Sequence, residues 1–349
     1  DDSFRSLTIL FFNDISLIGF IHRDELAGLR EFLFILSKLL PASEDYIAKL
    51  FEMYQWVDSI YDHPQGAKQL TGRLWLDKLK EIQFPEFRGE FVACKGSQPG
   101  YRGYPCGLWI LFHVLTVEHY NNGDRYPDLA GDAVAHAMNR FIPRFFSCTI
   151  CAFHFAANSA NIARPDEPRF PEHRLKPSEF NWDESILSQL PAAPTTAFEE
   201  VLWLNAVHNR VNKRLSGDIT EDPMAKKVQY PPRDVCPACW SRDPENDEKY
   251  ILGKTEKTKT VLFAFLVDHY KPTSWVTAAL PLSFLKLRGS VEWEDSTSRD
   301  LTTVVAVSVV ITVIAVVAIL LLSRFIWRFR TRKCGVSGYT HPVSTGLLA

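Results

Sequence analysis

Two Cys-x-x-Cys motifs, Cys148-x-x-Cys151 and Cys236-x-x-Cys239, carry the clearest chemistry in this sequence. Two thiols at this spacing form a redox-active disulfide, half of a tetrahedral zinc site, or a structural disulfide. The first motif follows two phenylalanines and is predicted to begin a short helix that ends at Asn158. Because the positive end of a helix dipole stabilises a thiolate, this position favours thiol–disulfide exchange. The motifs favour redox chemistry, and they leave zinc binding and purely structural disulfides open.

Aromatic and imidazole side chains lie close to this chemistry in the predicted helices. His154 follows Cys151 by three residues and therefore shares its helix face. Trp109 and His113 are four residues apart in a predicted helix over 107–120, which places an indole beside an imidazole. Ordinary core packing also explains each of these residues taken alone.

A row of polar side chains marks the predicted helix 196–215. Its members recur at helical spacing: Asn205, His208, Asn209 and Asn212. The solvated face of a surface helix usually carries Lys and Glu, and Asn is a mediocre helix former, so the row indicates neutral hydrogen-bonding groups. With the aromatic rings and the dithiol, these groups predict a flavin site. The sequence has no GxGxxG motif, so a Rossmann unit is not expected to hold the flavin.

The composition indicates a folded, mainly helical protein. The chain has 349 residues, is 46% hydrophobic and 23% charged, and has a formal net charge of -2, which gives no electrostatic basis for nucleic-acid binding. Apolar periodicity, caps and breakers predict the following further helices: 25–40, one capped by Ser43, a short one around Trp75, 128–146, and 258–270. Thr196 and Glu199 form a capping-box pattern, and residues 163–195, rich in Pro and charge, are predicted to be a loop.

An uncharged apolar run near the C-terminus predicts one transmembrane helix over residues 302–323. Acidic residues precede this run and a cluster of Arg and Lys follows it, so the positive-inside rule places residues 1–300 in a lumen or outside the cell. Six of the seven cysteines precede the run, an even number that agrees with disulfide formation in an oxidising compartment. The seventh, Cys334, follows the run. We therefore expect a stalk over 273–301 and a cytosolic tail over 324–349.

The cysteine, histidine and asparagine motifs together resemble a known family. Cys94-x-Gly-Ser through Pro-Cys106-x-Leu-Trp-x-Leu-Phe-His113, Phe-Phe-x-Cys148-x-x-Cys151-x-x-His, and His208-Asn-x-Val-Asn resemble the Erv/ALR sulfhydryl oxidase domain. The continuation to Cys236-x-x-Cys239 and the helix-rich segment ahead resemble quiescin sulfhydryl oxidases. The resemblance implies an all-α fold: a helix-rich, cofactor-free Erv-like bundle over 1–90, then a four-helix FAD-binding bundle over 91–272.

The resemblance also implies roles for individual residues. Cys151 would contact the flavin and Cys148 would exchange with incoming thiols. Two accessory disulfides would be Cys94–Cys106 and Cys236–Cys239. The residues that would line the FAD site are Arg102, Trp109, His113, Ile150, His154, Asn205, His208, Asn209, Val211, Asn212, Lys227 and Tyr230. Ile150, being apolar, would contribute packing or backbone contacts, and no metal ligand is expected.

The implied activity is FAD-dependent oxidation of protein or small thiols by O2, which yields disulfides and H2O2, in the Golgi or at the cell surface. The family also implies a thioredoxin domain upstream that this sequence does not contain, so we expect weak relay from protein substrates and continued oxidation of small thiols. Two other hypotheses remain: a zinc-stabilised, membrane-anchored interaction module that uses both Cys-x-x-Cys motifs, and a pseudo-enzyme that binds FAD without a physiological thiol substrate.

Overall fold

A computed structural model describes residues 1–63, 70–171, 173–180 and 182–272 of the chain. The predicted stalk, transmembrane helix and cytosolic tail lie outside these residues. In the described part, no helix has the length and apolar character needed to span a bilayer.

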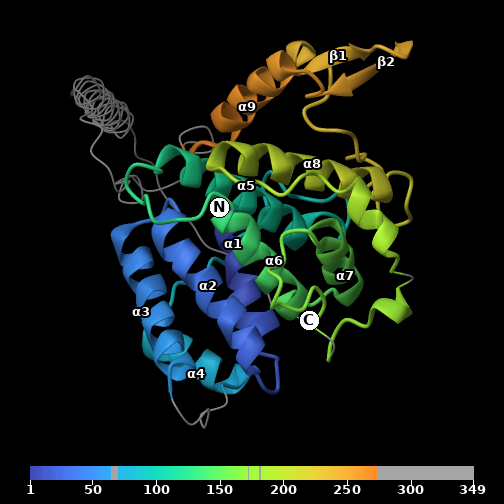
Figure 1. Ribbon diagram of the computed structural model, residues 1–349. Coiled ribbons are helices and arrows are strands. Elements are labelled where there is room, and N and C mark those ends of the chain that lie inside the picture. The colour runs from blue at the N-terminus through green and yellow to red at the C-terminus, as the bar shows by residue number, and fades with distance from the viewer. Residues whose placement is uncertain (64–69, 172, 181, 273–349) are drawn as a thin grey trace, which may run out of the picture. The chain divides into compact units, whose positions relative to one another are not determined.

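The described residues are mainly helical (Figure 1). The α-helices are α1 (Asp2–Ile9), α2 (Arg23–Leu39), α3 (Glu44–Tyr61), α4 (Gly72–Glu81), α5 (Gly103–Asn121), α6 (Ala133–Phe145), α7 (Thr149–Asn158), α8 (Ala197–Leu215) and α9 (Glu256–Tyr270). A π-helical turn η1 (Leu10–Ile15) continues α1, and the 3₁₀ turns are η2 (Pro177–Glu179), η3 (Glu184–Gln189) and η4 (Pro237–Cys239). In its described residues, the predicted loop over 163–195 contains the two short 3₁₀ turns η2 and η3 and no longer helix.

The prediction of an all-α fold is wrong at one place. Strands β1 (Trp240–Asp243) and β2 (Asn246–Leu252) form an antiparallel hairpin directly after the second Cys-x-x-Cys motif. The hairpin is short and mostly polar, so it gives no clear apolar alternation, and cross-strand pairing rather than core burial defines it. The turn Asp243-Pro-Glu-Asn246 between the strands is the signal that could have revealed it.

One predicted helix start and one predicted capping box also need correction. The helix predicted from residue 128 begins at Ala133, after a series of turns, and then continues through Pro143. At α8 only half of the capping box forms: the Thr196 hydroxyl accepts a hydrogen bond from the Glu199 N–H, but the Glu199 carboxylate accepts from Thr195 instead of the Thr196 N–H. Ser43 caps α3 as predicted, because its hydroxyl accepts from the Tyr46 N–H.

One hydrophobic core runs through the N-terminal helices and helices α5 to α8. Helix α1 packs along α5, and α2 packs along α6, where the rings of Phe32 and Phe141 stack 4.0 Å apart. Gly107 allows α5 to approach α1 closely, since a Cβ there would lie 2.2 Å from the Ser6 hydroxyl. The segment 1–90 is therefore part of the scaffold that holds α5 and α6.

Helices α5 to α8 form the bundle that positions the predicted site. Figure 1 shows α8 lying over α5, with α9 and the hairpin beyond it. The fully buried Glu200 of α8 joins three of these helices: it bonds His119 Nδ1 of α5 at 2.7 Å and accepts from the Ala135 N–H of α6 at 2.8 Å. Burial raises the pKa of Glu200, although the hydrogen bond from His119 opposes the rise.

Candidate functional site

The first Cys-x-x-Cys motif lies at the start of α7, as predicted. Cys148 is the N-cap residue and is joined to Cys151 by a disulfide, with the two Cα atoms 5.2 Å apart. The Cys148 sulfur accepts a hydrogen bond from the Cys151 N–H at 3.3 Å. When the disulfide opens, this N–H and the helix dipole both stabilise a thiolate on Cys148. Both cysteines are partly exposed, and Ile150 between them is 55% exposed.

A cavity of about 120 Å³ lies beside Cys151. Its walls come from α5, α6, α7 and α8 and are mostly apolar. Four of the predicted site residues line it: Trp109, Cys151, His154 and Val211. The shared helix face that the sequence predicts for Cys151 and His154 therefore opens onto one cavity.

Four aromatic rings continue from this cavity between α5, α8 and α9. The indole of Trp109 stacks on the imidazole of His208 at 4.1 Å and 5°. His208 Nδ1 is 3.0 Å from His113 Nε2, and the His113 ring stacks in turn on Tyr270 at 4.3 Å and 7°. Trp109 and His113 are thus not paired mainly with each other, as their spacing suggested, but each stacks on a ring from a different helix.

Burial keeps the imidazoles of this cluster neutral. It lowers the pKa of His208 to about 3, with a further contribution from the positive charge of Lys227. Burial together with His208 and His269 holds the pKa of His113 well below its ordinary value of 6.5. Neutral imidazoles can donate or accept one hydrogen bond at each nitrogen, and His113 Nδ1 is buried without a partner among the described residues.

The three asparagines of the polar row hold the segment that follows α8 and carries Tyr230. Asn205 and Asn209 both donate to the Tyr230 carbonyl oxygen at 2.9 Å, and Asn209 also accepts from the Tyr230 N–H at 2.7 Å. Asn212 donates to the Val228 carbonyl oxygen at 3.2 Å. All three side chains are buried, so the row is not a solvated face. Their hydrogen bonds fix the backbone of residues 228–230 against α8.

Two cations lie near each other at the edge of this cluster. Arg102 precedes α5 with a φ of 58° and donates to the Ala93 carbonyl oxygen at 2.8 Å. Burial and the positive charge of Arg102 lower the pKa of Lys227. The Cys94–Cys106 disulfide closes the loop that contains Arg102, and Asp2 of α1 accepts from the Cys94 N–H at 2.7 Å. Two neighbouring cations with buried nitrogens suit an anionic group.

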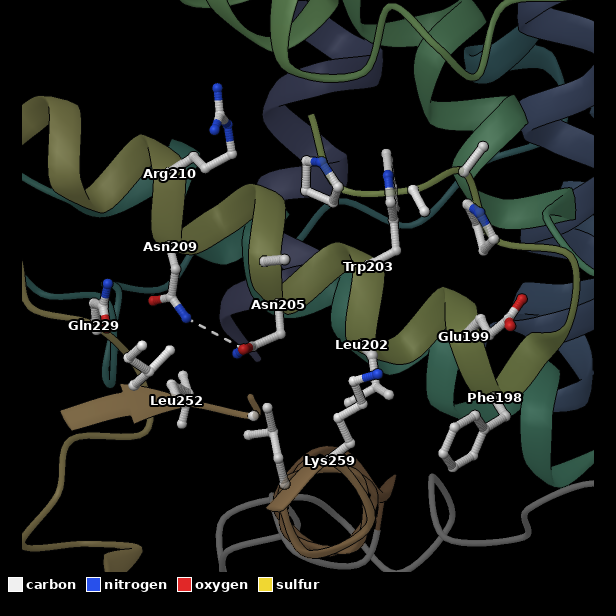
Figure 2. A pocket seen from close by; sticks show the side chains of 18 of the residues that line it. Phe198, Glu199, Leu202, Trp203, Asn205, Asn209, Arg210, Gln229, Leu252 and Lys259 are labelled. Carbon is white, nitrogen blue, oxygen red and sulfur yellow. Dashed lines mark hydrogen bonds between the residues drawn. The ribbon is translucent and has the colours of Figure 1, made fainter. Parts of the chain in front are cut away.

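A larger groove of about 710 Å³ lies along another side of α8 (Figure 2). It is lined by the loop 191–195, the end of β2 and the start of α9. Of the predicted site residues, only Asn205 and Asn209 line it, and Figure 2 shows their amides hydrogen-bonded to each other. We place the candidate site at the smaller cavity, because Cys151 lines that cavity and does not line the groove.

Comparison with known proteins identifies one domain of the chain. Residues 106–231 match the sequence model of the Erv1 / Alr family. This segment is an Erv/ALR domain. The chain is 30% identical over 268 residues to Sulfhydryl oxidase 1 of Rattus norvegicus, an alignment that covers 75% of this chain and 30% of the rat protein. It is 38% identical over 249 residues to Sulfhydryl oxidase 1 of Gallus gallus, covering 70% and 28% of the two chains.

The fold agrees with a solved structure. The chain superposes on a sulfhydryl oxidase fragment of human QSOX1 with a TM-score of 0.57 and 24% sequence identity, covering 78% of this chain and 95% of that one. This likeness establishes a helix-rich fold of the Erv/ALR type. The chain spans about 30% of the length of the rat relative.

A second family model, the rubredoxin-like zinc ribbon of ChsH2, matches residues 226–245, which follow α8 and overlap the end of the Erv/ALR domain. A structural zinc site takes four ligands, whereas this segment contributes two cysteines, and Cys236 and Cys239 are bonded to each other. In the described part of the chain, no group of three His, Cys, Asp or Glu side chains is arranged to hold a metal ion. Cys236 and Cys239 instead belong to a small apolar cluster with α9.

Several residues around the Erv/ALR site were not predicted from the sequence. Tyr270 and His269 come from α9, where Tyr270 stacks on His113 and His269 Nε2 is 2.8 Å from the Tyr230 hydroxyl. Phe155 and Arg214 line the cavity beside Cys151. The sequence predicts the helix 258–270 but gives little sign that it belongs to the site. Its last two residues, His269 and Tyr270, resemble an ordinary amphipathic helix end.

Proposed function

We propose that the chain is an FAD-dependent thiol oxidase that forms disulfides and passes the electrons to O2. The balanced reaction is 2 R–SH + O2 → R–S–S–R + H2O2. The observation that carries the proposal is the Cys148–Cys151 disulfide at a helix N-terminus, with Cys151 opening into a cavity walled by Trp109 and His154. An exchange-competent disulfide beside an aromatic cavity is what electron transfer from thiols to a flavin requires. The sulfhydryl oxidase relatives support this chemistry.

The residues present fit FAD. Trp109 and the neutral imidazoles offer flat faces for ring stacking, and His113 Nδ1, which has no partner among the described residues, offers a hydrogen bond to a ring edge. We assign Arg102 and Lys227 to the pyrophosphate, since each is a cation with a partly buried nitrogen. We assign the remaining contacts to Ile150, Val211, Tyr230 and the three asparagines of α8. When bound, FAD would accept two electrons from the dithiol and deliver them to O2.

The protein's own residues carry out the thiol chemistry. A substrate thiolate attacks the sulfur of Cys148 and forms a mixed disulfide, and the electron pair of the broken S–S bond leaves on Cys151. A second substrate thiolate then attacks the mixed disulfide and releases the oxidised substrate, which leaves Cys148 as a thiolate that the Cys151 N–H stabilises. Burial and, to a smaller extent, the positive charge of Arg214 lower the pKa of His154. The imidazole beside Cys151 is therefore held in its neutral form.

A visible absorption spectrum combined with an oxygen electrode tests this function. We expect the purified chain to show flavin bands and to consume O2 with dithiothreitol, producing one H2O2 per O2. A colourless protein that carries stoichiometric zinc would support the interaction-module hypothesis instead. A yellow protein that consumes no O2 with dithiothreitol or with a reduced protein would support the pseudo-enzyme.

We also propose that residues 302–323 anchor the oxidase in a membrane of the secretory pathway, Golgi or cell surface, with residues 1–300 in the lumen or outside. The proposed organisation is a cofactor-free segment 1–90, an FAD-binding segment 91–272, a stalk 273–301 and a cytosolic tail 324–349. The uncharged run between acidic and basic flanks supports this topology. Membrane fractionation of the full chain and of a chain that ends at residue 300 tests it: only the full chain should sediment with membranes after a carbonate wash.

A further inference from the structure

The turn that precedes Cys148 is held by a carboxylate from the N-terminal segment. Asp14 Oδ2 accepts a hydrogen bond from the Ser147 N–H at 3.0 Å. The same oxygen accepts from the Tyr104 hydroxyl at 2.7 Å. Ser147 directly precedes Cys148, so one side-chain atom of the segment 1–90 is bonded to the backbone next to the redox-active disulfide.

Asp14 is itself fixed in place. It lies in the π-helical turn η1, in which Leu10, Phe11 and Ile15 are buried. The Trp75 indole N–H of α4 donates to the Phe11 carbonyl oxygen at 2.8 Å and joins this turn to α4. Here the π-helical turn brings Asp14 to a segment 133 positions later in the chain.

Residues 146–147, directly before Cys148, have further contacts besides the one with Asp14. Arg174, from the loop 163–195, donates to the Phe146 carbonyl oxygen. The Tyr104 ring lies 5.4 Å from the Phe146 ring. The neighbouring His173 bonds Glu25 of α2 at 2.7 Å, which anchors the loop to the N-terminal segment. Residues 146 and 147 thus have partners from η1, α5 and the loop 163–195, and Asp14 is the partner adjacent to Cys148.

We propose that Asp14 is a positioning residue for the Cys148–Cys151 disulfide: it holds the turn at residues 146–147, which sets the position of Cys148 relative to Cys151. The proposal rests on the proposed function only in taking Cys148 and Cys151 as the redox pair. A fixed turn keeps the two sulfurs at bonding distance and raises their effective concentration, so the disulfide is favoured over the dithiol. The N-terminal segment then acts on the redox equilibrium of the Erv/ALR domain without contacting the cavity.

The equilibrium constant for reduction of this disulfide by dithiothreitol tests the proposal. In that reaction one dithiothreitol molecule loses two electrons and two protons and closes to its cyclic disulfide, while the Cys148–Cys151 bond breaks and both sulfurs become thiols. The measurement uses the full chain without O2, and alkylation followed by peptide mass spectrometry reports this pair alone. Since neither O2 nor flavin turnover enters it, a protein that fails as an oxidase still gives a readable equilibrium constant.

Three variants separate positioning from charge and from general structure. Asp14→Ala should favour the dithiol by about five-fold, the effect of losing a hydrogen bond of ordinary strength. Asp14→Asn should remain within about two-fold of wild type, because both donors use one oxygen and an amide oxygen can accept both. Asp77→Ala removes an exposed carboxylate of the same segment, paired with Arg73, and should leave the constant unchanged.

An unchanged constant in Asp14→Ala overturns the proposal, and so does an equal shift in Asp14→Asn, since charge would then be the cause. If Asp14→Ala does not fold, Tyr104→Phe takes its place. That variant removes one of the two hydrogen bonds to the carboxylate and keeps the ring beside Phe146. It should shift the constant toward the dithiol by about two-fold, and no shift there counts against the proposal.

Discussion

At the scale of single residues, the two cysteines of the first motif differ in their surroundings. Cys148 caps α7 and accepts a backbone hydrogen bond, whereas Cys151 opens into the aromatic cavity. This asymmetry supports the division of roles in which Cys148 meets the substrate and Cys151 meets the flavin. The sequence predicts the helix start at Cys148, whereas the cavity beside Cys151 is known only from the tertiary structure.

Replacing Cys151 with serine tests that division. We expect Cys151→Ser to abolish O2 consumption with dithiothreitol and to keep the flavin bands. A serine hydroxyl is similar in size to a thiol, so the cavity keeps its shape, but it cannot form the disulfide or donate electrons to the flavin. Cys236→Ser, in the other Cys-x-x-Cys motif, should retain O2 consumption and lose stability instead. Normal turnover in Cys151→Ser would refute the assignment.

The buried histidines predict a loss of stability in acid. His113 and His208 have pKa values below 6.5 in the folded state, so below that pH the unfolded chain binds protons that the folded chain does not. Their contribution to stability is therefore complete above pH 6.5 and is lost as the pH falls toward their pKa values in the folded state, which for His208 is about 3. We expect about 1 kcal/mol per histidine per pH unit over part of this range.

Urea unfolding of the purified chain between pH 7 and pH 5 measures this effect. His208→Gln should flatten the dependence of the free energy of unfolding on pH, and His63→Gln, a change at an exposed histidine, should not. If the free energy of unfolding depends on pH equally in wild type and in His208→Gln, then His208 binds protons in the folded protein as readily as in the unfolded chain, which contradicts the prediction.

At the scale of elements, α8 is joined to its neighbours by buried polar side chains. Asn205, Asn209 and Asn212 bond the backbone of residues 228–230, and Glu200 bonds α5 and α6. Helix α8 thereby holds Tyr230, which the resemblance assigns to FAD. It also holds α5, which carries Trp109. The prediction that this row is chosen for hydrogen bonding agrees with these contacts, but the partner of the asparagines here is the chain's own backbone.

Asn209 makes the largest share of these hydrogen bonds. Asn209→Ala removes bonds to both the N–H and the carbonyl oxygen of Tyr230 and leaves buried polar groups unpaired. We expect the free energy of unfolding to fall by about 2–3 kcal/mol. Asn121→Ala, at an exposed position with a single long hydrogen bond of 3.4 Å, should change it by less than about 0.5 kcal/mol. Similar small losses in both variants would mean that the asparagine row does not fix the 228–230 segment.

At the scale of the whole molecule, the N-terminal helices and the Erv/ALR domain share one core. Phe32 and Phe141 stack across α2 and α6, and His136 of α6 bonds Glu31 of α2 and Glu167 of the following loop. Burial disfavours protonation of His136, but the hydrogen bonds and charges of Glu31 and Glu167 outweigh it and raise its pKa. The segment 1–90 thus shares its hydrophobic core with the domain.

Truncating Phe32 tests this continuity. We expect Phe32→Ala to cost about 3–5 kcal/mol, because a fully buried ring leaves a cavity between α2 and α6. The unfolding curve of wild type and variant should show one transition by near-UV circular dichroism and by flavin absorbance alike. Two transitions, with only one of them shifted in Phe32→Ala, would indicate that the two parts unfold separately.

Local features of this protein were determined by the sequence alone. The Ser43 cap, the helix that begins at Cys148 and the shared face of Cys151 and His154 depend on residues three or four positions apart, and short-range geometry is enough to predict them. The hairpin at 240–252 and the start of α6 escaped prediction because polar strands and turn residues leave no apolar period to read.

Only the tertiary structure decided which distant groups meet. The stacking of His113 on Tyr270, the hydrogen bonds from Asn209 to Tyr230 and the contact of Asp14 with Ser147 join residues many positions apart. No periodicity or spacing encodes such pairs, because they follow from how whole helices pack in three dimensions. The residue types therefore indicated thiol and flavin chemistry, while packing placed Cys151 at the cavity and Asp14 behind Cys148.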